Sequence, residues 1–323
     1  MGVGLACALG AACGSQDGPR GAAVDVAAPI RPGAASPEAA VTDLIAHLRR
    51  NDLAAIPRIA LPPALHARAD AEWRTGRMRW PLVELPLDDR IPGLLSALSA
   101  PNAERTLQAR FHQQLSGQTK ALQDAARGLG QFGQQYLRHE GDYSAQERQH
   151  YIRVLGALSA WAQRAPLGDQ SRGRQAIHLL TVAAARTGLQ GGADLDRLGM
   201  TASLKGLTPL YIAIKQVFGL YGLGLDETLA GLRAERTRQT GDQAWVKVSY
   251  RLAGKPVETE LAAVRIEGRW YLVDYVKAIQ VIDPAAVEAA SGGPSAPARD
   301  GADHSRPASV DGPRERGGDG KAG

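Results

Sequence analysis

The amino-acid sequence predicts an α+β fold that is mostly helical, with a C-terminal antiparallel meander of three to four strands packed on helices. Apolar residues recur at helical spacing over most of the chain before residue 230, whereas after it they alternate with polar residues as in strands. The 323 residues are 44% hydrophobic, which is enough for a buried core. We therefore expect one α+β domain over 36–288, with a helical part at 36–230, the β-meander at 231–275 and a short C-terminal helix.

The first helix is predicted from the residues that begin it. Ser36 suits the N-cap, Pro37 the first helical position, and Glu38 the positive end of the helix dipole. Apolar residues then follow at helical spacing. We expect this helix to stop at Asn51-Asp52, which would cap a short second helix from Leu53 to about Ile59.

The middle of the chain also has a helical pattern. Prolines interrupt any long element through 79–102, and apolar stripes predict helices from 103 to about 190. Ser144 and Glu147 have the spacing of a capping box at the start of one of these helices. A further helix is predicted to begin at Thr208-Pro209.

The meander is predicted from alternation with period two. Strands are expected at Trp245–Leu252, Val257–Ile266 and Arg269–Asp274, because Gly-containing turns separate these segments. The segment 231–239 is a candidate for a fourth strand.

The charge of the chain argues against a nucleic-acid partner. The sequence pI is about 9.3, but 38 basic residues face 33 acidic ones, so the net charge is only +5. The basic residues of the middle are interleaved with acids or spaced along helices. Phosphate binding requires a concentrated Lys/Arg surface, so we expect no nucleic acid to bind.

Both cysteines, Cys7 and Cys13, lie near the N-terminus. Small apolar residues run from Val3 to Ala12 and meet Cys13-Gly14-Ser15. This segment resembles the lipobox of bacterial lipoproteins, in which the signal is cut before the cysteine and the thiol carries a diacylglyceryl group. The resemblance implies a lipid on Cys13, which would hold the chain on a membrane because each buried CH₂ contributes about 0.8 kcal/mol.

The resemblance also implies that residues 1–12 are the signal. The composition of 13–35, which contains Gly and Pro without periodicity, predicts a flexible tether, and the lack of large apolar residues over 289–323 predicts a disordered tail. The expected location is the cell envelope, on the outer membrane facing the periplasm, with the inner membrane left open. Cys7 is the alternative acceptor. No Lys or Arg precedes the apolar run, which a start codon further upstream would explain.

A second resemblance covers residues 36–60 and 230–275. A leading helix pair followed by a meander whose last hairpin contains EGRWYLVD, starting at Glu267, is similar to the α+β cone of the nuclear-transport-factor-two-like superfamily. Members use the concave face of the sheet for binding, dimerisation or catalysis. The intervening residues would then be a helical insertion.

Three motifs could carry chemistry, and each has a plainer interpretation. Glu147-x-x-His150 has a metal-binding spacing but lacks the second such pair that a di-iron bundle needs. Gly128 to Gly133 fits the dinucleotide fingerprint without a preceding strand, so its glycines are expected to weaken a helix or to permit close packing. Asp194 to Gly199 begins like a calcium loop, but Lys205 stands where the bidentate Glu should be. We expect no cofactor and no metal.

Two classes of function remain. The first is a non-enzymatic binding or scaffolding module that uses a sheet face or a helical groove, with membrane lipid contacted through the anchor and an unknown protein or small-molecule partner. The alternative is a hydrolase-like periplasmic enzyme whose dispersed residues meet in a pocket against the C-terminal sheet. A His beside an Asp or Glu in a closed pocket would favour the enzyme, and an apolar or open concavity the binding module.

Overall fold

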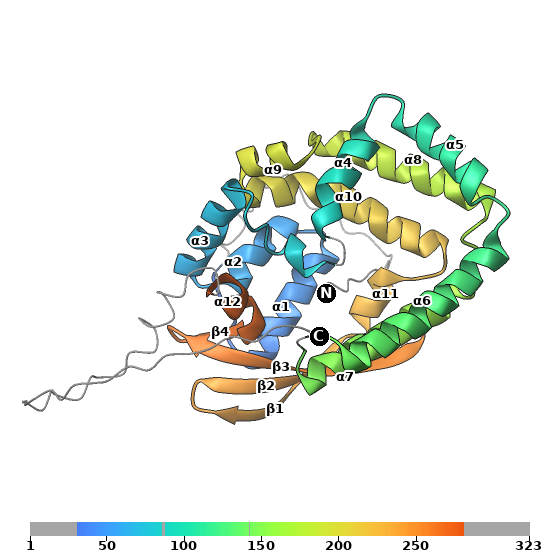
Figure 1. The fold of residues 1–323 in the computed structure, drawn as a ribbon. Helices are drawn as coiled ribbons and strands as arrows, with labels where there is room; N and C mark the ends of the chain where they lie inside the picture. The colour runs from blue at the N-terminus through green and yellow to red at the C-terminus, as the bar shows by residue number, and fades with distance from the viewer. Residues whose placement is uncertain (1–30, 86–87, 142, 281–323) are drawn as a thin grey trace, which may run out of the picture. The chain divides into compact units, whose positions relative to one another are not determined.

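A computed structural model describes residues 31–85, 88–141 and 143–280, and it has the predicted α+β fold (Figure 1). Helices come first, and a four-stranded antiparallel sheet follows near the end of the described chain. Of the described helices, none is both long and apolar enough to cross a membrane.

The first helix begins and ends where the sequence predicts, but the cap expected at Asp52 does not form. The Asp52 carboxylate pairs instead with the His47 ring at 2.9 Å and makes no capping bond to the next helix. Helix α1 (Pro37–Arg49) begins at Ser36, whose hydroxyl accepts a hydrogen bond from the Ala39 N–H at 3.2 Å. Asn51 adopts a positive φ just after the helix ends. The next elements are η1 (Leu53–Ala55), α2 (Ile56–Ala60), α3 (Pro63–Arg74), η2 (Leu82–Glu84) and η3 (Asp88–Arg90).

Eight helices follow in the middle of the described chain. The first five are α4 (Ile91–Ser99), α5 (Ala103–Gln114), α6 (Thr119–His139), α7 (Ala145–Ala162) and α8 (Gln170–Thr187). The others are α9 (Gly192–Leu198), α10 (Met200–Leu220) and α11 (Leu225–Ala230). The predicted capping box forms at the start of α7, where Ser144 and Glu147 each bond to the other's backbone N–H.

The helix expected to begin at Thr208-Pro209 begins instead at Met200. Helix α10 continues through Pro209, although this residue has no N–H for the preceding turn. The turns before Pro209 carry buried Met200 and Leu204, and packing therefore holds them helical. Further along α10, the buried Lys215 Nζ is paired with Asp226 Oδ1 of α11 at 2.5 Å.

The sheet is a meander in the order β1-β2-β3-β4, followed by α12. Its elements are β1 (Arg233–Thr240), β2 (Gln243–Leu252), β3 (Lys255–Ile266), β4 (Arg269–Leu272) and α12 (Val273–Gln280). The fourth strand suggested by the sequence is therefore present. The last strand ends at Leu272, two residues earlier than expected, because the chain turns into α12 there.

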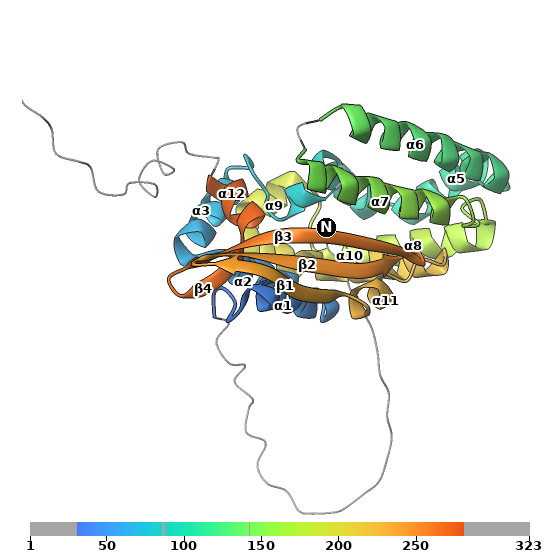
Figure 2. The ribbon, with the colours of Figure 1, turned by 90° about the horizontal axis from the view of Figure 1, so that it is seen from below.

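The sheet buries one face. Alternate residues of β2 from Ala244 to Leu252 are buried, and α1 packs across all four strands. On the other face, the Arg238 guanidinium stacks on Trp245, with 3.7 Å from its Cζ to the ring centroid. Figure 2 shows the strands in front of α1 and α10. Gly33 and Ala34 belong to the last part of the segment expected to be a tether, and both are hydrogen-bonded to β4. The Arg269 guanidinium donates to the Gly33 carbonyl, and Ala34 forms a β-bridge with Trp270.

Helix α7 covers a free edge of the sheet. The short β4 pairs only with residues 263–266 of β3, which leaves earlier carbonyls on that side without a strand partner. The Gln146 amide donates to the Glu260 carbonyl at 2.5 Å, and the Arg153 guanidinium donates to the Glu258 carbonyl at 3.1 Å. Side chains of α7 thus replace the missing strand.

Two connections of the chain meet at one corner. The Gly117 N–H, between α5 and α6, donates to the Gly168 carbonyl between α7 and α8 at 2.9 Å. The Gly168 N–H donates in turn to Thr119 Oγ1 at 3.2 Å. A Cβ at Gly168 would lie 2.6 Å from the Thr119 nitrogen, so the two backbones approach too closely for any larger residue. From this corner, α6 runs along α7 and α5 runs along α8 (Figure 1).

Candidate binding site

The predicted lipid acceptor Cys13 and its alternative Cys7 lie outside the described residues. Most of the expected tether and the whole expected tail, 289–323, also lie outside them. The structure therefore bears on the domain between these segments.

The Glu147 and His150 pair has structural roles. The Glu147 carboxylate accepts a hydrogen bond from the Ser144 N–H at 2.8 Å, and hydrogen bonding with Ser144 lowers the pKa of Glu147. The His150 ring lies 6.4 Å from the Tyr250 ring on the sheet, and burial lowers its pKa, which favours the neutral imidazole. The described residues contain no group of three His, Cys, Asp or Glu side chains that could hold a metal ion.

The glycines that fit the dinucleotide fingerprint lie inside α6, with no strand before them. A Cβ at Gly130 would lie 2.6 Å from the Ser159 Cβ of α7, and a Cβ at Gly133 would lie 2.7 Å from Leu155 Cδ2. Gly128 faces open space. Two of the three glycines therefore let α6 and α7 approach closely, which is the plainer role expected for this pattern.

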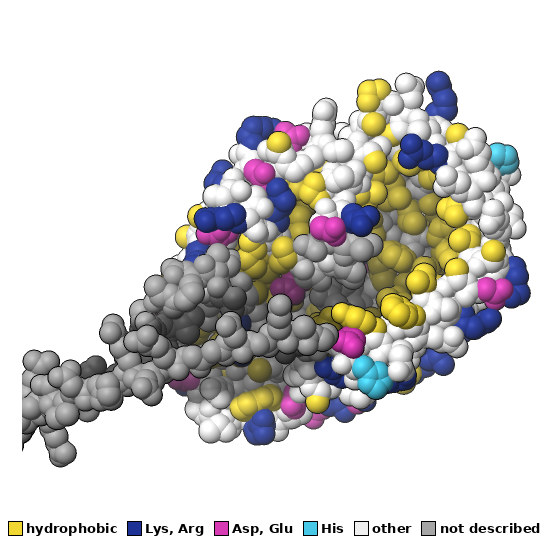
Figure 3. Space-filling model, in the orientation of Figure 1, with side chains coloured by type: hydrophobic (Ala, Val, Ile, Leu, Met, Phe, Trp, Pro, Cys, Tyr) yellow, Lys and Arg dark blue, Asp and Glu magenta, His cyan; other side chains and the backbone are white. Residues whose placement is uncertain are grey.

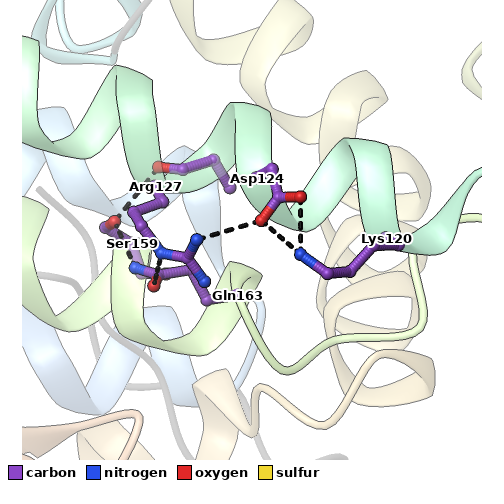
Figure 4. Close-up of polar contacts among 6 residues, drawn as sticks. Lys120, Asp124, Arg127, Ser159 and Gln163 are labelled. Atoms are coloured by element: carbon purple, nitrogen blue, oxygen red, sulfur yellow. Dashed lines mark hydrogen bonds and ion pairs between the residues drawn. The ribbon is translucent and has the colours of Figure 1, made fainter.

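A polar network completes the contact between α6 and α7 (Figure 4). Asp124 accepts from Lys120 at 2.6 Å and from Arg127 at 3.0 Å, and the Lys120 hydrogen bond is the main cause that lowers its pKa. Arg127 Nε then donates to the Gln163 amide oxygen of α7 at 3.1 Å. The Ser159 hydroxyl donates to the Ala126 carbonyl, also at 3.1 Å. These bonds fix the rotation of α6 about its own axis.

This rotation leaves three large apolar side chains of α6 exposed. Leu129 and Phe132 are each 70% exposed, and Tyr136 is 49% exposed. Together with the half-buried Leu122 they lie at helical spacing on one side of α6. We call these four residues the α6 apolar face.

Helix α6 borders a hollow. Figure 3 shows hydrophobic side chains along α6 and on the helices opposite it, around a depression in the right half of the view. In Figure 1 the same region lies between α6 and the α4, α5 and α10 helices. Neighbouring apolar side chains that are exposed mark sites of interaction, so this face is the candidate binding site.

Two further cavities lie away from the α6 apolar face. A groove of about 520 Å³ is lined by residues of α8 and α10, and a smaller cavity of about 150 Å³ lies beside Arg79 and Asp89. His178 of the α8–α10 groove lies 3.1 Å from the Glu104 carboxylate, but within the described chain neither lining includes a residue of the sheet. The cavities thus lack the arrangement that would favour a hydrolase-like site against the sheet.

No family model, curated protein or solved structure matches the chain. The resemblance of the N-terminus to bacterial lipoproteins, and that of 36–60 and 230–275 to the nuclear-transport-factor-two-like superfamily, therefore stay predictions.

Sequence reasoning missed the α6 apolar face as a site. The signal was the helical spacing of Leu122, Leu129, Phe132 and Tyr136. This spacing marks an apolar side of the helix that is distinct from the side with the glycines. Such spacing predicts an apolar face but does not say which neighbour covers it.

Alanine substitutions at Gly128 and Gly130 should change stability in opposite directions. Gly130→Ala places a methyl group against Ser159 and should destabilise the fold by about 1–3 kcal/mol. Gly128→Ala fills open space within a helix and should stabilise it by about 0.5–1 kcal/mol. Chemical denaturation of the two variants and the parent chain measures both changes. Equal effects at the two positions would contradict the packing of α6 on α7.

Proposed function

We propose that this protein is a non-enzymatic binding module, tethered to the bacterial outer membrane and facing the periplasm, that holds an apolar partner on the α6 apolar face. The observation that carries the proposal is the 70% exposure of Leu129 and Phe132 on α6, a helix that borders a hollow. Fully burying such a side chain contributes about 1.5–3 kcal/mol. A partner that covers both residues therefore has a substantial source of binding free energy.

The way α6 is held supports a binding role. Its contact with α7 combines the close approach at Gly130 with the polar network from Asp124 to Gln163. The apolar side chains therefore project from a helix whose orientation is already set, and a partner need not order it on binding. Preorganisation of this kind raises affinity because less conformational entropy is lost in the complex.

The tether is the second part of the proposal. It rests on the apolar run that ends at Cys13 and on the expected attachment of a diacylglyceryl group there. Several acyl chains together give stable membrane anchoring. Such an anchor would keep the binding module near the membrane surface. Apolar partners in the envelope would then encounter the α6 apolar face at high local concentration.

Charge placed on the α6 apolar face should abolish binding of an apolar probe. The Leu129→Glu/Phe132→Glu variant should bind the neutral dye N-phenyl-1-naphthylamine at least about tenfold more weakly than the parent chain, because the contact would desolvate two carboxylates. Dye fluorescence during titration measures the affinity. The melting temperature should stay unchanged, since both side chains are exposed.

The matched control is Gln131→Glu/Gln135→Glu, which adds the same charge to the same helix outside the α6 apolar face. This control should bind the dye like the parent chain. If the control loses as much affinity as the Leu129/Phe132 variant, or if neither loses any, the α6 apolar face is not the binding site.

The mature chain extracted from bacterial membranes should begin at Cys13 and carry acyl chains. Intact-mass measurement tests this directly, because the signal and the lipid both change the mass. Cys13→Ala should abolish the acylated species, whereas Cys7→Ala should leave it in place. An unmodified chain that begins at Met1, or acyl chains on Cys7, would overturn the Cys13 anchor. Neither result would affect the dye-binding prediction.

A further inference from the structure

The groove between α8 and α10 has an apolar wall on each side. Leu179 and Val182 line it from α8, and Pro209 and Ile212 line it from α10. Its volume of about 520 Å³ falls in the size range of small-molecule sites, which are mostly apolar with a few polar groups. The full lining is His178, Leu179, Val182, Ala183, Arg186, Thr208, Pro209, Ile212, Ala213 and Gln216.

Basic side chains gather at one end of this groove. Arg186 is part of the lining. Lys205 precedes Pro209 by one helical turn and so lies on the same side of α10. A Cβ at Gly206 would lie 3.4 Å from the Thr187 carbonyl, so this part of α10 lies beside the C-terminal end of α8. Arg186 and Lys205 therefore belong to the same end of the groove.

These two cations have no anionic partner within the described chain. Both side chains are exposed, and neither takes part in a hydrogen bond or ion pair there. The opposite end differs, because His178 already contacts the Glu104 carboxylate at 3.1 Å. His178 and Arg186 are separated by eight residues of α8, or about 12 Å. The groove thus runs from a paired His–Glu end to an unpaired basic end.

We propose that the α8–α10 groove binds a single-chain anionic amphiphile of the fatty-acid class. The alkyl chain lies between the apolar walls, and the carboxylate meets Arg186 and Lys205. Arg is suited to this role because its guanidinium pairs with a carboxylate through two parallel hydrogen bonds. The site is separate from the α6 apolar face and does not depend on the proposed function of that face.

Calorimetric titration with dodecanoate, below its micelle concentration, tests the site. The parent chain should bind dodecanoate at least about tenfold more tightly than dodecanol, which has the same alkyl chain without the charge. The Arg186→Glu/Lys205→Glu variant should lose this preference. Val182→Trp should weaken binding of both ligands, because the indole occupies the groove. Melting curves check that each variant is folded.

Two control variants show whether dodecanoate binds in this groove and not elsewhere on the domain. Arg174→Glu reverses an exposed charge on α8 outside the lining and should leave dodecanoate binding unchanged. The Leu129→Glu/Phe132→Glu variant should also bind dodecanoate normally, whatever its effect on dye binding.

Three outcomes would overturn the proposal. These are equal affinity of the parent chain for dodecanoate and dodecanol, an equal loss in Arg174→Glu, and binding to phosphatidylglycerol vesicles without binding of monomeric dodecanoate. The last result would assign the basic end to a membrane surface.

Discussion

The contact of two backbone segments at Gly168 holds the helix pairs α5–α8 and α6–α7 together at one corner of the domain. The connections before α6 and before α8 approach so closely that Gly168 has no room for a side chain. Because both connections are held at one corner, α6 leaves it along α7 and α5 leaves it along α8. Helices α5 and α6 diverge from this corner, and the hollow lies between α6 and the α4, α5 and α10 helices.

The second constraint is the small-residue side of α6. Gly130 and Gly133 bring α6 close to α7, and the Asp124 and Arg127 network fixes the helix rotation. A helix has only one side for each neighbour, so the side with Phe132 must point elsewhere. Large apolar groups left in water lower the solubility of a domain. Under the proposed function, these exposed side chains are the surface that a partner covers.

Much of the local structure could be predicted from the sequence because local residues cause it. The caps at Ser36 and Ser144 and the alternation of the meander depend on neighbours within a few residues. Thr208-Pro209 misled the prediction, because its N-terminal signature is weaker than the burial of the preceding turns. The candidate sites could not be predicted. The groove depends on how α8 and α10 pack against each other, and the exposure of Phe132 depends on which other elements pack against α6.

Thiol reactivity at position 132 tests most directly whether α6 presents its large apolar side to solvent. Phe132→Cys and Ser159→Cys would each be introduced separately into a chain that carries Cys7→Ser and Cys13→Ser. Each single cysteine would then be modified with a water-soluble thiol reagent. The cysteine at 132 should react nearly as fast in the folded chain as in the urea-unfolded chain. The cysteine at 159, buried between α6 and α7, should be protected. Equal protection at the two positions would contradict the account, because another part of the chain would then cover the α6 apolar face.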